Sequence, residues 1–146
     1  FIAEILYKTI QEQEPNPELF NYLYHSIQVL ELKEEGISNF HLYFLIHLMK
    51  YLGFFPDNNY SDQKCYFDLK IGSFVQIRPM HTLGMDAEES KILSQLLVFS
   101  EDQHEKLKIP YKIRMIILEK VIDYYELHNT GISHIKSLSV LKEVFH

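Results

Sequence analysis

Histidine is the first residue type in this sequence that could do chemistry, because the 146-residue chain carries eight of them. A metal site needs ligands that recur at fixed spacing on one face, and the chain contains no His-Glu-x-x-His. Glu101-Asp102-Gln103-His104 provides one Glu-x-x-His spacing, whereas carboxylate-bridged di-iron bundles need two such copies and two further Glu. A His-rich metal-binding enzyme fragment therefore stays an alternative to scattered solvated or core histidines.

Cysteine and glycine patterns indicate no active site either. Cys65 is the only cysteine, so it can form neither an internal disulfide nor a multi-thiolate zinc site. It has no recognisable basic partner, and the chain lacks the Walker and Rossmann glycine patterns. We therefore expect a protein that is not an enzyme, with no catalytic residue, no cofactor and no metal.

Charge is unevenly distributed along the chain. The formal net charge is −6, so bulk electrostatics should not attract nucleic acid. Residues 1–36 carry seven Glu against two Lys. Residues 103–122 carry two Glu against five cations, which are Lys106, Lys108, Lys112, Arg114 and Lys120. These cations could bind phosphates or an acidic peptide, or they could form an ordinary solvated face balanced against the acidic helices.

Arg114 is unusual among these cations. At about 100° per residue it falls on the apolar side of its predicted helix, beside Ile117, Leu118, Val121 and Tyr125. A guanidinium buried without a partner is very costly. Either an internal carboxylate pairs with Arg114, or Arg114 lines a groove that admits an external anion.

The first half of the chain predicts three helices, at residues 1–13, 18–34 and 39–52. The second should bury one face, made of Leu19, Phe20, Leu23, Ile27 and Leu30. The third, capped by Ser38 or Asn39, is apolar over most of its circumference and should be central. His41 lies on an apolar face and suits a core imidazole, whereas the more polar positions of Tyr22 and Tyr43 make them candidates for ligand contact.

The second half predicts a small β-hairpin at 65–77 around Gly72, then three more helices. Asp86 and Glu89 have capping-box spacing at the start of a helix over 87–99. Pro110 suits the first turn of a helix that runs to His128, which we expect to be a second core imidazole. A last helix should cover 133–145.

The fold class that follows is mainly α: one helical bundle-like domain, 1–146, with one small β-hairpin insertion. No apolar run is long enough to span a membrane and no signal peptide is visible. We therefore expect a cytoplasmic protein. The chain begins at Phe1 without Met and enters a helical pattern at once, which suggests a fragment.

Several segments, taken in order, resemble the C-terminal helical domain of RecO, a bacterial DNA repair and recombination mediator, most closely its Bacteroidetes-like branch. The segments that carry the resemblance are Asn39-Phe40-His41-Leu42-Tyr43-Phe44-Leu45, Tyr51-Leu52-Gly53-Phe54-Phe55-Pro56, Tyr66-Phe67-Asp68-Leu69-Lys70-Ile71-Gly72, Tyr124-Tyr125-Glu126-Leu127-His128 and Lys136-Ser137-Leu138-Ser139-Val140-Leu141-Lys142-Glu143-Val144-Phe145.

The resemblance implies a larger protein with an N-terminal OB-fold that binds single-stranded or double-stranded DNA. It also implies a nucleoid-associated role in recombinase loading and strand annealing, with RecR and the single-stranded-DNA-binding protein as partners. In some relatives the acidic, Phe-terminated tail of the latter enters an apolar groove edged with basic residues. We expect such a groove here, and the candidate contact residues are Arg114, Lys112, Lys108, Lys106, Lys50, Lys33 and Tyr43.

Two departures from the family pattern affect these expectations. Many relatives carry four zinc-binding cysteines after the Leu-Gly-Phe-x-Pro element, whereas this chain has Asp62 and Cys65, then Gln76 and Pro79. Zinc should therefore be absent, and aromatic packing should hold the hairpin together. Relatives that bind the acidic tail have arginines just before the central helix, where this chain has residues 37–39, Ile-Ser-Asn. The position of the groove therefore stays open.

Overall fold

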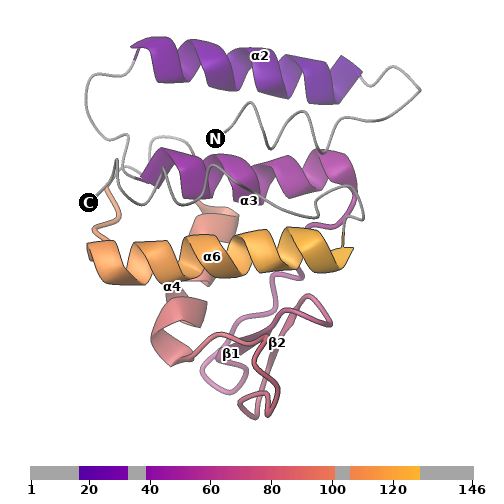
Figure 1. Ribbon diagram of the computed structural model, residues 1–146, viewed down its shortest axis with the longest axis vertical. Helices are drawn as coiled ribbons and strands as arrows, with labels where there is room; N and C mark the ends of the chain where they lie inside the picture. Colours follow the sequence, from indigo (N-terminus) through magenta and orange to yellow (C-terminus); the bar gives the residue numbers. More distant parts are fainter. Residues whose placement is uncertain (1–16, 33–38, 101–105, 129–146) are drawn as a thin grey trace.

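The computed structural model describes residues 17–32, 39–100 and 106–128. Within these ranges the fold is mainly α, with one two-stranded hairpin, as the sequence predicts. Figure 1 shows α2, α3 and α6 as layers and the hairpin at one end of the molecule. The helices are α2 (Pro17–Leu32), α3 (Phe40–Leu52), α4 (Ala87–Val98) and α6 (Tyr111–His128), and the strands are β1 (Tyr66–Asp68) and β2 (Ser73–Val75). The helices predicted at 1–13 and 133–145 lie outside the described residues.

Helix α3 is the central element, as its nearly uniform apolar character predicts. Phe40 and every residue from Leu42 to Met49 are buried, and α2, α4 and α6 all pack against this helix. Asn39 occupies the N-cap position, but its side chain makes no capping bond and instead donates to the Leu107 carbonyl at 2.5 Å. The start of α3 is thereby tied to the segment that leads into α6.

Two tyrosines attach the neighbouring helices to the backbone of α3. The Tyr22 hydroxyl of α2 donates to the Phe44 carbonyl at 2.9 Å, and the buried Tyr125 hydroxyl of α6 donates to the Leu45 carbonyl. Each carbonyl has a second lone pair that its own helix leaves available. Burial of the Tyr125 phenol raises its pKa well above the ordinary value, so this donor stays protonated.

Helix α2 turns only part of the predicted face inward, because Leu19, Leu23 and Leu30 pack against the core but the other two predicted residues do not. Leu19 and Ser26 are buried, whereas Phe20 is 67% exposed and Ile27 46% exposed. Tyr22 takes the inward position because its ring stacks on Phe44 and Tyr51, at 5.6 and 4.6 Å between ring centroids. The prediction that Phe20 and Ile27 are buried is therefore wrong, because the amphipathic Tyr22 turns the helix toward α3.

The hairpin forms where it was predicted, with Phe67 opposite Phe74 in its antiparallel register. These two rings lie 5.0 Å apart. The Asn59 side chain pairs with both backbone groups of Phe74, at 2.9 and 3.0 Å, and the Ser90 hydroxyl of α4 accepts the Phe67 amide at 2.9 Å. Aromatic packing and side-chain bonds to the backbone therefore hold the hairpin against the helices.

Helices α4 and α6 meet through a partly buried ion pair. The predicted capping box is present, because Asp86 accepts from the Glu89 amide and Glu89 accepts from the Asp86 amide. The same Glu89 carboxylate lies 2.6 Å from Lys120 of α6, whose ammonium also donates to the Gly84 carbonyl at 2.7 Å. At the far end of α6, His128 bonds the Leu69 carbonyl at 2.7 Å, which is the satisfied imidazole that the sequence predicts.

None of the described helices is both long enough and apolar enough to cross a membrane.

Substitution of two glycines with positive φ tests the packing around the hairpin. A Cβ on Gly53 (φ +90°) would have no atom within 4 Å, whereas a Cβ on Gly72 (φ +68°) would lie 2.8 Å from the Tyr124 hydroxyl oxygen. That hydroxyl is held by its bond to the Phe54 carbonyl. In urea unfolding, Gly53→Ala should cost about 1 kcal/mol and Gly72→Ala about 2 kcal/mol or more. Equal losses would contradict the close approach.

His41 should make stability depend on pH. Burial lowers the pKa of His41 to about 4 from its ordinary 6.5, so the unfolded chain binds the proton more readily. Stability is then full above pH 6.5 and falls as the pH drops from 6.5 toward 4, by about 1.4 kcal/mol for each unit of pKa difference. Urea unfolding between pH 7 and 4.5 measures this loss. His41→Gln should remove that part of the pH dependence, and an unchanged profile would contradict it.

Candidate functional site

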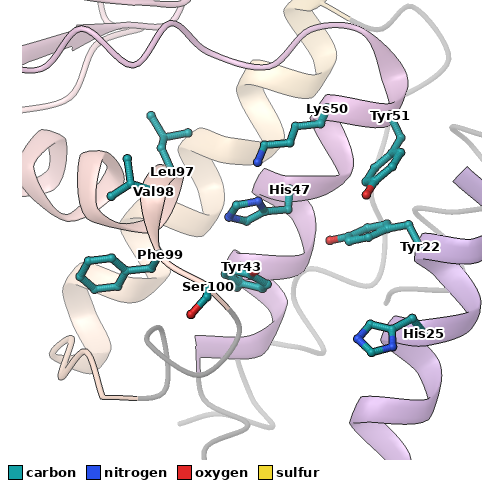
Figure 2. Close-up of a pocket in the computed structure, with 10 residues that line it drawn as sticks. All are labelled: Tyr22, His25, Tyr43, His47, Lys50, Tyr51, Leu97, Val98, Phe99 and Ser100. Carbon is teal, nitrogen blue, oxygen red and sulfur yellow. The ribbon is translucent and has the colours of Figure 1, made fainter. Parts of the chain in front are cut away.

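A pocket lies between α2, α3 and the end of α4 (Figure 2). Its volume is about 450 Å³, which is within the range of small-ligand sites. Its lining is Tyr22 and His25 from α2, Tyr43, His47, Lys50 and Tyr51 from α3, and Leu97, Val98, Phe99 and Ser100 from the end of α4 and just beyond. The walls are thus mainly aromatic and aliphatic.

One stripe of α3 lines the pocket, with the buried Tyr43 and His47 at its base and the exposed Lys50 at its mouth. Tyr43, His47 and Lys50 are spaced i, i+4 and i+7, which places them on one helix face. The Tyr43 and His47 rings lie 4.2 Å apart. Figure 2 shows this stripe facing the end of α4, with the Lys50 ammonium extended toward Leu97 and Val98.

His47 joins the two walls of the pocket. Its ring Nε2 lies 2.9 Å from the Leu96 carbonyl oxygen, in the last turn of α4. A carbonyl can only accept, so Nε2 carries the hydrogen and donates. Phe99 ends α4 with an extended backbone, and its amide donates to the Gln95 carbonyl. The apolar Leu97–Phe99 segment is therefore held at a fixed distance from α3.

The electrostatics of the lining favour an anion. Lys50 is the only Lys or Arg among the ten lining residues, and none of the ten is Asp or Glu. No carboxylate among the described residues lies within ion-pair distance of Lys50, whose ammonium instead lies 4.8 Å from the centre of the Phe55 ring. A recess with aromatic and aliphatic side chains beside one exposed cation suits a ligand that combines an apolar group with a carboxylate.

The structure places two of the predicted contact residues, Tyr43 and Lys50, in this pocket. Tyr43 is only 9% exposed and is one of the residues that line the pocket. Lys106, Lys108 and Lys112 are exposed around the start of α6 and do not line the pocket. Lys33 lies outside the described residues.

Arg114 is half-buried and also lies apart from the pocket lining. Its guanidinium donates to the Ile109 carbonyl at 3.4 Å and lies 5.7 Å from the centre of the Tyr111 ring. No carboxylate among the described residues pairs with it. The internal ion pair offered as one explanation for Arg114 is therefore not found in this part of the chain.

Several lining residues were not singled out from the sequence. His47 had a detectable signal, because it is a polar residue in an apolar helix, four residues after Tyr43 and three before Lys50. His25 and Leu97–Ser100 had none, since their place in the pocket depends on how α2 and α4 lie against α3. Within residues 17–32, 39–100 and 106–128 no group of three or more His, Cys, Asp or Glu could hold a metal ion. Glu101–His104 lie outside these ranges.

Comparison with known proteins gives one consistent result. The family described as "Recombination protein O C terminal" matches residues 1–138. The chain is 40% identical to the DNA repair protein RecO of Azobacteroides pseudotrichonymphae over 145 residues, which is 99% of this chain and 60% of the relative. It is 35% identical to RecO of Phocaeicola vulgatus, again over 99% of this chain and 60% of the relative. It is 38% identical to RecO of Flavobacterium johnsoniae, over 99% of this chain and 59% of the relative.

The chain thus spans about 60% of the length of these curated relatives. No solved structure matches it. The match to the family covers nearly the whole sequence and agrees with the segments that carried the resemblance. The chain belongs to the family of RecO C-terminal domains.

Proposed function

We propose that this domain is a non-enzymatic docking module in recombinational DNA repair, and that its pocket binds an acidic peptide with an apolar side chain. The observation that carries the proposal is the lining: ten residues that include one exposed lysine and no carboxylate, around mainly aromatic and aliphatic walls. The partner that fits is the acidic, Phe-terminated tail of the single-stranded-DNA-binding protein, which the family resemblance implies.

The proposed binding mode follows from the two parts of the pocket. A phenyl side chain placed against Tyr43, Leu97 and Val98 would lose most of its contact with water, and such anchors supply most of the binding energy in peptide complexes. A carboxylate next to it would meet the Lys50 ammonium at the mouth. Charge attraction at an exposed lysine adds about 1 kcal/mol of affinity and directs the acidic peptide to this site.

The other partners rest on the family resemblance. We infer that the whole protein contacts DNA mainly through an OB-fold outside this chain, that it binds RecR, and that it works in the cytoplasm near the nucleoid. The mediator role then consists of bringing these partners together, so that recombinase can load on single strands and complementary strands can anneal. The rival idea, a metal-binding enzyme fragment, has no supporting ligand cluster in the described residues.

Titration of an acidic nonapeptide ending in Phe, followed by isothermal calorimetry, tests the pocket. Lys50→Met should weaken binding about fivefold and reduce its dependence on salt, because about 1 kcal/mol of charge attraction is lost. Lys70→Met is the matched control, since Lys70 is an exposed lysine of the hairpin turn that does not line the pocket. Replacing the peptide's Phe with Ala should cost about 2 kcal/mol or more. If neither Lys50→Met nor the loss of the peptide's Phe weakens binding, the pocket is not the binding site.

Arg114 provides a separate test of where the peptide's carboxylates lie. The sequence-based hypothesis is that Arg114 and the nearby lysines meet them, and it predicts that Arg114→Ala weakens peptide binding in a salt-sensitive way. Equal affinity of the variant and the wild type would remove Arg114 from the binding surface. A lower melting temperature with unchanged affinity would assign Arg114 a structural role, through the Ile109 carbonyl and the Tyr111 ring.

A further inference from the structure

Two consecutive phenylalanines, Phe54 and Phe55, follow α3, and their rings contact different parts of the molecule. Gly53 takes a left-handed conformation (φ +90°), and the amides of Gly53 and Phe54 both donate to the Met49 carbonyl, at 3.0 and 3.1 Å. This tight stop turns Phe54 toward the core, where its ring and that of Tyr125 form a T-shaped pair with centroids 5.2 Å apart. The Phe54 carbonyl accepts the Tyr124 hydroxyl at 2.8 Å. Phe54 is therefore explained by packing alone.

Phe55 lies instead beside the residues of the pocket. Its ring centroid lies 4.8 Å from the Lys50 ammonium and 6.0 Å from the His47 ring centroid. Phe55 is not itself a lining residue. It therefore contacts His47 and Lys50 from outside the pocket.

We propose that Phe55 is a positioning residue, which holds the Lys50 ammonium at the mouth of the pocket. An ammonium over an aromatic face is attracted by the ring quadrupole. An exposed lysine otherwise samples many rotamers and must lose that freedom when a ligand binds. Because the Phe55 ring restricts Lys50 before the ligand arrives, part of this entropic cost is already met. This inference rests on the proposed function of the pocket.

The surroundings of Lys50 explain why the Phe55 ring can position its ammonium. Lys50 has no carboxylate partner among the described residues to hold its side chain, and its helix is fixed on its other sides by the core. Among the described residues, no internal ion pair therefore draws the ammonium away from the Phe55 ring or from a ligand in the pocket. A ligand carboxylate can approach Lys50 without first displacing an internal acid, and the ring can remain beneath the ammonium in the complex.

Replacement of the ring tests the proposal in the intact domain. Phe55→Leu keeps an apolar side chain but removes the quadrupole, and it should weaken binding of the acidic nonapeptide about two- to fourfold. The salt dependence should stay unchanged, because the lysine charge remains. Phe55→Tyr keeps a ring face and should bind as the wild type does. In the Lys50→Met background, Phe55→Leu should cause no further loss, since there is no ammonium left to position.

An NMR measurement reads the position of Lys50 without any ligand. The ε-methylene protons of Lys50 should show an upfield ring-current shift in the wild type and in Phe55→Tyr, and this shift should disappear in Phe55→Leu. A merely structural role of Phe55 would lower the melting temperature and weaken binding equally in both Lys50 backgrounds, and that result would overturn the proposal. If peptide binding needs Lys50 but Phe55→Leu binds as tightly as the wild type, only this inference fails. If the wild-type domain does not bind the peptide, the proposed function fails first.

Discussion

The burial of α3 on almost every side is the constraint on which the rest of the structure depends. A helix whose residues from Leu42 to Met49 are all buried must be surrounded, and α2, α4 and α6 surround it. Apolar packing alone would leave these neighbours free to slide, but tyrosine hydroxyls from α2 and α6 bond successive carbonyls of α3. Directional bonds therefore set the register of helices that hydrophobic burial brings together.

The pocket arises from the one stripe of α3 that is not purely apolar. Tyr43 and His47 are buried there among aromatic rings, and the imidazole bonds the last turn of α4. The end of α4 stands against this stripe without filling the space in front of it, so the pocket remains between the helices. Lys50, one turn further along, reaches water at the mouth. The same helix that organises the core thus provides both the aromatic base and the cation of the candidate site.

The sequence predicts those features that depend on neighbouring residues. The uniform apolar character of α3, the capping box of Asp86 and Glu89, the helix start after Pro110 and the hairpin around Gly72 all follow from local patterns, and all are present. The inward face of α2 was only partly predictable in this way, since Leu19, Leu23 and Leu30 pack against the core but Phe20 does not. Counting apolar residues favours Phe20, whereas the observed packing favours Tyr22, whose ring can stack and whose hydroxyl can bond α3 at the same time. The pocket is harder still to predict from local sequence patterns, because Leu97–Ser100 and His25 reach it only through the packing of whole helices.

An intermolecular NOE experiment tests the central claim most directly. The labelled domain would be saturated with an unlabelled acidic peptide ending in Phe, and contacts to the peptide's aromatic protons would be recorded. We predict NOEs from these protons to the methyl groups of Leu97 and Val98 and to the ring of Tyr43, which line one pocket from two helices. NOEs confined to residues 106–114, with none to the pocket, would contradict the account.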